Sequence, residues 1–143
     1  MVSPNFAYLW PSASQPAAYG TPDLLKVVVL MTDGEYNSVY YNGIIASDST
    51  TGSGSTDYHI NHVSKNNPET SYTQAQNLCD NMKAAGVIVY TVGLDVINTS
   101  AAHDLMANCA TDSTHVYFPS NGTELKQAFH DIAMGIAWLR LSK

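Results

Sequence analysis

The stretch Lys26-Val-Val-Val-Leu-Met-Thr-Asp-Gly34 decides the fold of this 143-residue chain. Over 26–31 it is a continuous apolar run without alternation, which is typical of a strand buried on both faces of a parallel sheet. Two further runs have the same character, Val-Ile-Val-Tyr-Thr-Val-Gly-Leu at 87–94 and His-Val-Tyr-Phe at 115–118. The sequence therefore predicts three strands.

Helical patterns follow each of these strands. A capping-box pattern at 71–74 begins the first helix, Gly86 is a natural stop for it, and Asn121 with Glu124 begins the last helix. Each helix has apolar residues at helical spacing. These stripes consist of Ala75, Leu78, Cys79 and Met82; of Ala102, Leu105, Met106 and Cys109; and of Leu125, Phe129, Ile132, Ala133 and Ile136.

Strands that alternate with helices indicate an α/β fold, a doubly wound, Rossmann-like parallel sheet with helices on both faces. If the strands step across the sheet in one direction, right-handed crossovers place the first two helices on one face and the last helix on the other. Three strands make a narrow sheet. We therefore expect part of a larger three-layer domain, or one that borrows strands from a partner.

Two regions are expected from the distribution of proline. Residues 1–24 contain Pro4, Pro11, Pro16 and Pro22, which disfavours regular structure. Their aromatic residues predict a lead-in packed on the domain, and 25–143 forms the domain itself. Residues 36–70, rich in Gly and Ser, are expected to be a long loop without regular structure.

The composition excludes several classes of function. Six Lys and Arg against twelve Asp and Glu give a net charge of −6 without a basic cluster. Binding to nucleic acid or to an anionic membrane surface is therefore not expected. The sequence has no stretch of about 20 apolar residues and no signal-peptide pattern at its start. Any membrane attachment would need a preceding anchor.

Asp33 is the main candidate for chemistry. It follows a buried strand, in the crevice where open α/β sheets bind ligands, and a carboxylate there can ligate a hard cation. Gly34 would allow a tight turn. The neighbouring residues form a possible binding rim, consisting of Thr32, Gly34, Glu35, Tyr36 and Asn37, with Tyr40 and Tyr41 beyond it. An ordinary solvated Asp-Gly turn is the alternative interpretation.

The segment 26–34 resembles the fourth strand and Thr-Asp-Gly turn of a von Willebrand factor A (VWA) domain. Residues 78–93 are similar to the following helix and fifth strand. More narrowly, the chain resembles the C-terminal half of TadG-like proteins of the Flp (Tad) pilus assembly system. The residues that carry this likeness are Ser3-Pro4, the Cys79 helix, Asn108-Cys109-Ala110, the Tyr117 strand, 121–125, Phe129 and Leu139-Arg140-Leu141.

The metal site of that family, the MIDAS, needs an Asp-x-Ser-x-Ser motif and a further Thr. This chain has no such motif, and Asp48-Ser-Thr-Thr lies in the loop. Only Asp33 matches the family's set. The resemblance therefore implies Mg²⁺ or Ca²⁺ only if the missing half of the site is supplied, and we expect the chain to be a fragment or half of an assembly.

The resemblance implies a non-enzymatic binding or scaffold domain outside the cytoplasm. Its partners would be pilus assembly components or another copy of the chain, through edge pairing or swapping. Two alternatives remain open. One is a small metal-dependent hydrolase that uses Asp33 and Glu35, with Asp95 as a further acidic residue. The other is a structural fragment without a site.

Cys79 and Cys109 lie on the apolar stripes of helices that would be neighbours, so a disulfide between them is expected in the oxidising compartment that the resemblance implies. Two free buried cysteines are the alternative.

The histidines are not expected to form a site. His59 and His62 are expected to be polar loop residues. His103, His115 and His130 are scattered and are expected at the surface or at an edge.

Overall fold

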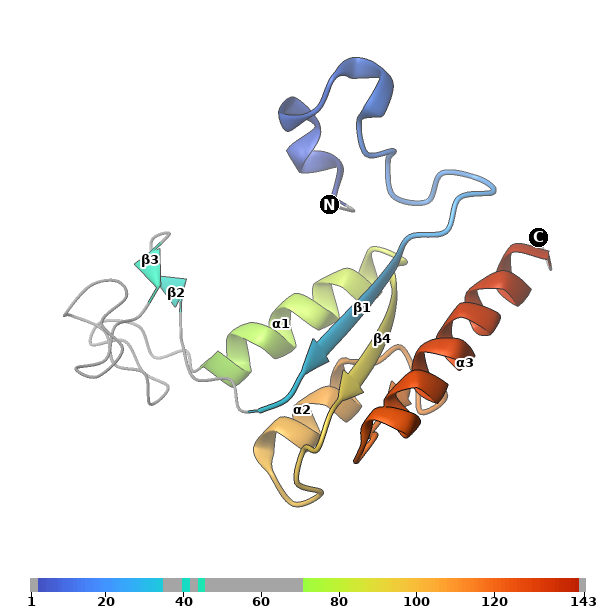
Figure 1. Ribbon diagram of the computed structural model, residues 1–143. Coiled ribbons are helices and arrows are strands. Elements are labelled where there is room, and N and C mark those ends of the chain that lie inside the picture. Colours follow the sequence, from blue (N-terminus) through green and yellow to red (C-terminus); the bar gives the residue numbers. More distant parts are fainter. Residues whose placement is uncertain (1–2, 35–39, 42–43, 46–70, 142–143) are drawn as a thin grey trace.

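The computed structural model describes residues 3–34, 40–41, 44–45 and 71–141. Its centre is a parallel sheet of three strands in the order β1-β4-β5 (Figure 1). The strands are β1 (Val27–Thr32), β4 (Ile88–Gly93) and β5 (Val116–Tyr117). The predicted α/β fold is confirmed, and the strands step across the sheet in one direction.

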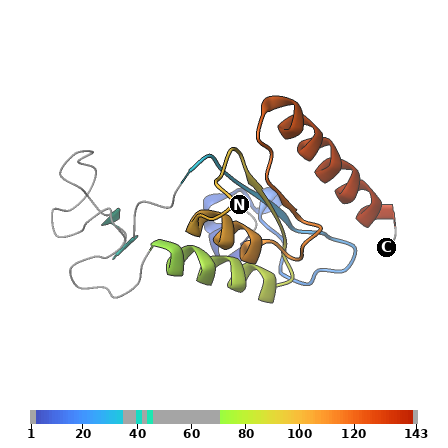
Figure 2. The ribbon, with the colours of Figure 1, turned by 90° about the horizontal axis from the view of Figure 1, so that it is seen from below.

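Three α-helices pack on this sheet. They are α1 (Ser71–Ala84), α2 (Ala101–Cys109) and α3 (Gly122–Leu141). Figure 2 shows α1 and α2 side by side on one face of the sheet, with α3 on the other. Right-handed crossovers between neighbouring parallel strands give this arrangement.

Local signals account for where the helices begin and end. The Ser100 hydroxyl caps α2 by accepting the His103 N–H at 3.1 Å. The Asn121 side chain caps α3 by accepting the backbone N–H groups of Thr123 and Glu124, each at 3.0 Å. After α1, Gly86 has a φ of 76°, the left-handed conformation typical of a helix stop.

The central strand β4 organises the core on both faces. Tyr90 and Val92 are buried against Ile132 of α3. On the other face, the buried Thr91 hydroxyl donates a hydrogen bond to the Met106 carbonyl of α2 at 2.9 Å. A buried hydroxyl without a partner would be costly, so this bond makes Thr91 compatible with the core.

The expectation that β1 is buried on both faces is wrong. Val29 is 39% exposed and Met31 is 46% exposed. Their register partners in β4 are Tyr90 and Val92, whose side chains point toward α3. Val29 and Met31 therefore point to the same face, but α3 packs over β4 and leaves the outer part of β1 uncovered.

The helical stripes also need correction at three positions. Leu78 is 60% exposed, Phe129 is 42% exposed and Ala133 is exposed too, although all three were predicted to face the sheet. On α3 the buried position is Ala128, with Ile132 one turn later. A narrow sheet contacts only the centre of each stripe, so residues at its margin remain in solvent.

A disulfide joins Cys79 in α1 to Cys109 at the end of α2, with the two Cα atoms 5.1 Å apart. This separation lies within the usual range for disulfides. Both residues are buried between the helices and the sheet. The predicted pairing is therefore the one that the structure contains, and it closes a loop with a sequence separation of 30.

Short elements lie where the sequence predicted none. Two 3₁₀ helices, Pro4–Leu9 and Ser12–Ser14, occur in the Pro-rich lead-in. Pro4 fits the first turn of a helix, where its missing N–H is not needed. Strands β2 (Tyr40–Tyr41) and β3 (Ile44–Ile45) pair antiparallel within the expected loop. The lead-in has no buried residue in its helices, and its close packing on the domain stays a prediction.

Candidate functional site

Asp33 directly follows β1 at the carboxyl edge of the sheet, where its side chain is exposed. The Thr32 hydroxyl holds this turn by donating to the Gly34 carbonyl at 3.0 Å and accepting the Gly34 N–H at 3.3 Å. Gly34 does not have a positive φ, and a Cβ there would meet no atom of the described residues within 4 Å. The turn thus does not require glycine, contrary to expectation.

The end of β4 brings a second carboxylate to the same edge. The Leu94 N–H donates to the Thr32 carbonyl, and the Asp95 N–H donates to the Pro119 carbonyl, each at 2.9 Å. These bonds hold the ends of the three strands together. Asp95 has a φ of 53°, which aspartate tolerates better than most residues, and its side chain is exposed.

An aromatic contact supports this edge from the α2 side. The ring of Phe118 stacks on the imidazole of His103 with centroids 4.0 Å apart and an angle of 20° between the planes. His103 Nδ1 is buried and has no hydrogen bond with any described residue, and Asp104 Oδ1 lies 3.6 Å from it. The sequence predicted a surface or edge position for His103 and missed this stacking.

The remaining predicted residues fall in different places. Glu35, Tyr36 and Asn37, together with the loop histidines at 59 and 62, lie outside the described residues. His115 Nδ1 lies 2.8 Å from Asp112 Oδ1, at the opposite end of β5 from Asp33. His130 is exposed on α3. The structure therefore brings none of these described histidines to the carboxylate of Asp33.

The described residues do not by themselves fit a divalent cation at this edge. Mg²⁺ and Ca²⁺ need six or more oxygen ligands. The edge offers the carboxylates of Asp33 and Asp95, while the Thr32 hydroxyl is hydrogen-bonded to Gly34. In the described part of the chain, no three His, Cys, Asp or Glu side chains gather as a metal site would require.

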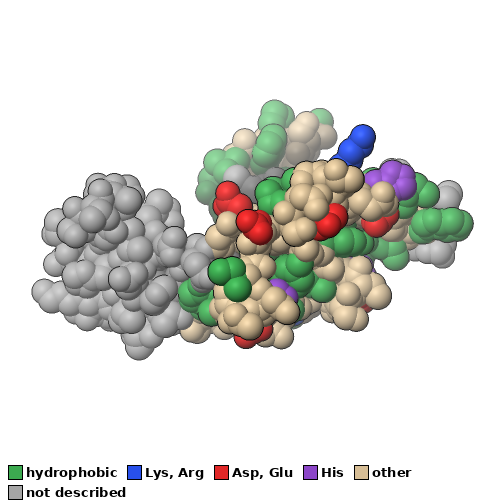
Figure 3. All heavy atoms as spheres, turned by 60° about the horizontal axis from the view of Figure 1, so that its bottom comes forward, with side chains coloured by type: hydrophobic (Ala, Val, Ile, Leu, Met, Phe, Trp, Pro, Cys, Tyr) green, Lys and Arg blue, Asp and Glu red, His purple; other side chains and the backbone are tan. Residues whose placement is uncertain are grey.

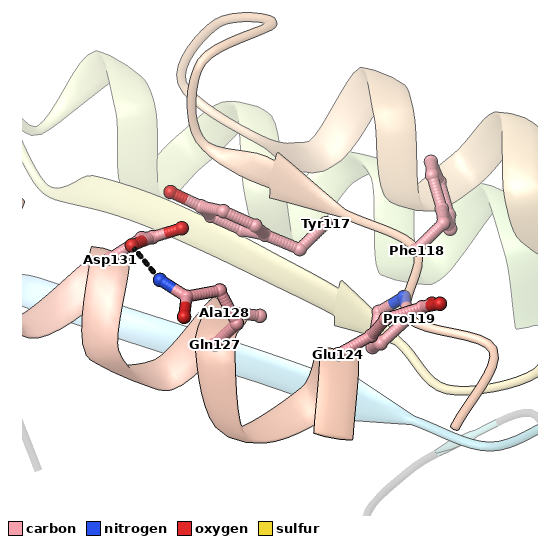
Figure 4. Close-up of a pocket in the computed structure, with 7 residues that line it drawn as sticks. All are labelled: Tyr117, Phe118, Pro119, Glu124, Gln127, Ala128 and Asp131. Carbon is pink, nitrogen blue, oxygen red and sulfur yellow. Dashed lines mark hydrogen bonds between the residues drawn. The ribbon is translucent and has the colours of Figure 1, made fainter. Parts of the chain in front are cut away.

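A pocket between β5 and α3 was not predicted. It has a volume of about 230 Å³, and its lining consists of Tyr117, Phe118, Pro119, Glu124, Gln127, Ala128 and Asp131 (Figure 4). Burial raises the pKa of Tyr117, and the charge of Asp131 raises it further. The spacing of Glu124, Gln127 and Asp131 on one helix flank was visible in the sequence. Their position beside a strand was not, because it depends on the packing of α3.

One face of the molecule carries mainly acidic charge. On the face drawn in Figure 3, acidic side chains project from a mixed polar and apolar surface and basic ones are scarce. This agrees with the net charge of −6. Among the described helices, none combines the length and the apolar character needed to cross a bilayer.

Comparison with known proteins identifies a likeness of fold. No protein-family profile and no curated protein sequence matches the chain. A crystal structure of the pilus adhesin SpaC from Lactobacillus rhamnosus GG superposes with a TM-score of 0.52 and 16% sequence identity. The match covers 78% of this chain and 16% of the adhesin. This chain therefore has the same fold as the matched part of the adhesin. Because the sequence identity is so low, the likeness shows a common fold and nothing more. The chain spans only a small part of the length of that adhesin.

Proposed function

We propose that this chain is part of a non-enzymatic protein-binding domain that works outside the cytoplasm in pilus assembly or adhesion. In its specific form, it is the C-terminal half of the VWA-type domain of a TadG-like Flp pilus assembly protein. The observation that carries this proposal is the exposed carboxylate of Asp33 at the carboxyl edge of a parallel sheet. Open α/β sheets bind their ligands at this edge.

Two further observations support the proposal. The fold is similar to part of a pilus adhesin. The disulfide between Cys79 and Cys109 is of a kind that persists in oxidising compartments such as the periplasm or cell surface. A divalent cation would take part only with ligands from outside the described residues, because Asp33 and Asp95 are too few.

The outer edge of β1 supports a partner that adds a strand. Among the described residues, β1 pairs with β4 alone. Its residues 27–32 include no charge and no proline, the usual protection of an edge strand. A pilus component or a second copy of this chain could therefore extend the sheet there and cover Val29 and Met31.

The test is binding to pilus filaments sheared from the source bacterium and immobilised on a biosensor. We expect the chain to bind, and Asp33→Asn to weaken binding at least about fivefold, as for loss of one charge-assisted contact. The control, Asp104→Asn, removes an exposed carboxylate from α2 and should bind like the unaltered chain. Absence of binding, or equal binding by Asp33→Asn, would contradict the proposal.

A hydrolase is the second candidate, because Asp33 and Asp95 follow neighbouring strands at one edge. Metal-dependent hydrolases can use such carboxylates as metal ligands or general bases. The test is turnover of nitrophenyl acetate or nitrophenyl phosphate with added Zn²⁺ or Mg²⁺. Activity that is lost in both Asp33→Asn and Asp95→Asn would establish this class. A chain that neither binds filaments nor turns over these substrates would be a structural fragment.

A further inference from the structure

The outer edge of β5 has backbone groups available for pairing. The Thr91 N–H donates to the His115 carbonyl and the Asp95 N–H to the Pro119 carbonyl, each at 2.9 Å. Residues 115 and 119 therefore turn their carbonyls toward β4. Because successive residues of a strand turn these groups to opposite sides, those of Val116 and Phe118 point outward. Among the described residues no strand pairs with this edge.

The pocket described above lies directly beside this edge. Figure 4 shows the ring of Tyr117 extending along the pocket toward Asp131, while the ring of Phe118 turns away. Pro119 and Glu124 close the other end. A side chain of a segment paired with β5 could therefore enter the pocket over the face of Tyr117.

The charge of the pocket indicates which kind of partner side chain it would bind. None of its seven lining residues is basic, and two are acidic. Both oxygens of Glu124 already accept hydrogen bonds at the start of α3. They accept the Ser120 N–H at 2.8 Å, the Ser120 hydroxyl at 2.9 Å and the Asn121 amide at 2.8 Å. Asp131 Oδ1 accepts the Gln127 amide at 2.7 Å, and His130 Nδ1 lies 3.4 Å from the same oxygen. Asp131 Oδ2 accepts no hydrogen bond from the described residues, so it can receive one from a ligand.

The two carboxylates of the pocket are not directed at a common point. Glu124 and Asp131 are seven positions apart on α3. At about 1.5 Å rise per residue, their Cα atoms lie roughly 10 Å apart along the helix axis. Both would have to approach an ion to about 2.0–2.6 Å. Because both oxygens of Glu124 already accept hydrogen bonds from Ser120 and Asn121 at the start of α3, that carboxylate is not directed at an ion beside Asp131. Asp131 is therefore the carboxylate that a ligand in the pocket would contact.

We propose that the outer edge of β5 binds an extended peptide segment of a partner protein, and that the pocket takes one arginine or lysine side chain of that segment. The cation would lie over Tyr117 and donate to Asp131. Arginine suits the site better, because its planar group stacks on aromatic rings and donates two parallel hydrogen bonds to a carboxylate. Backbone pairing supplies affinity, and the pocket supplies specificity. This site is independent of Asp33 and goes beyond the proposed function.

The test uses a short peptide of alternating Thr and Val with one central Arg, titrated into the isotope-labelled full chain and followed by amide NMR shifts. We expect the largest shifts at Val116 and Phe118. Replacing Arg by the uncharged citrulline should weaken binding about tenfold, the loss typical of one charge-assisted hydrogen bond. A peptide with N-methyl groups on one edge should not bind, because it lacks the donors needed for pairing.

Matched variants of the chain complete the test. Asp131→Asn keeps an acceptor for Gln127 but removes the negative charge. This variant should bind the Arg peptide about tenfold more weakly and bind the citrulline peptide as the unaltered chain does. Asp104→Asn and Asp33→Asn should bind the Arg peptide normally, which separates this site from the carboxyl edge. The proposal is overturned if the Arg peptide does not bind, if Arg and citrulline bind equally, or if the shifts map to β1.

Discussion

The ring of Phe118 packs so closely on Gly93 that a Cβ atom added at position 93 would lie 2.9 Å from Phe118 Cδ1. The same atom would lie 3.1 Å from Val96 Cγ2. Phe118 cannot simply move away, because its ring also stacks on His103. Glycine at the end of β4 is thus a packing requirement, and it keeps the carboxyl ends of β4 and β5 together.

Gly93→Ala should lower the free energy of unfolding by about 1–3 kcal/mol, the usual cost of overpacking. Denaturant unfolding monitored by circular dichroism would measure it. Gly122→Ala is the control, because a Cβ at position 122 meets no atom within 4 Å, and it should change stability by no more than about 1 kcal/mol. A Gly93→Ala chain as stable as the control would show that the ring does not restrict this position.

Removal of the disulfide should destabilise the chain strongly. For a sequence separation of 30, loss of the link between Cys79 and Cys109 should cost about 3–4 kcal/mol by the loop-entropy relation. The double variant Cys79→Ala/Cys109→Ala and a reductant should have similar effects on unfolding. Reductant should not affect the double variant further. Two free thiols by mass spectrometry of protein isolated from an oxidising compartment would contradict the pairing.

Asp112 should give the chain a specific acid sensitivity. Hydrogen bonds from the Thr114 hydroxyl, His115 and the Thr114 N–H lower its pKa from 3.8 to about 2. Because the folded pKa lies below the unfolded one, Asp112 stabilises the fold above about pH 4, and this contribution is lost as the pH falls toward 2. In Asp112→Asn, the free energy of unfolding should therefore decrease less between about pH 4 and pH 2 than in the unaltered chain.

The control for this measurement is Asp23→Asn, which removes an exposed carboxylate from the lead-in and keeps a residue that tolerates its φ of 58°. Its acid unfolding curve should match that of the unaltered chain in shape. If Asp112→Asn also retains that shape, the hydrogen bonds to Asp112 do not contribute to acid stability.

The chain should bind divalent metal weakly. Asp33 and Asp95 provide fewer ligands than Mg²⁺ needs, and strong binding would require oxygen atoms from other residues or from a partner. Isothermal calorimetry should give a Mg²⁺ dissociation constant no tighter than about millimolar, the range of weak extracellular Ca²⁺ modules. A micromolar constant abolished by Asp33→Asn would reveal additional ligands.

The uncovered edge of β1 should cause self-association. Light scattering after gel filtration should show an average mass that rises with concentration, because unpaired apolar edges pair with one another. Met31→Lys places a charge on the exposed face of this strand and should shift the chain toward monomer. Ile97→Lys, at an exposed apolar residue away from β1, is the control. A monomer at all concentrations would contradict the expectation.

Much of the architecture was present in local patterns of the sequence. The apolar runs predicted three strands in the right places. The side chains of Ser100 and Asn121 cap the first turns of α2 and α3. The position of Asp33 at the carboxyl edge follows from the end of β1. The pairing of Cys79 with Cys109 followed from stripes on neighbouring helices. These features depend on residues close together in sequence, or on the handedness of crossovers, which is nearly invariant.

Other features depended on how far each layer extends over its neighbour. The apolar runs of β1 and β4 look alike, yet β4 is central and buried, whereas Val29 and Met31 lie on an edge strand that α3 does not cover. Leu78 and Phe129 are exposed for a similar reason. The pocket between Tyr117 and Asp131 exists only because α3 packs beside β5. A side chain's periodicity determines which way it points, but burial depends on what lies opposite, and that is decided by contacts between residues distant in sequence.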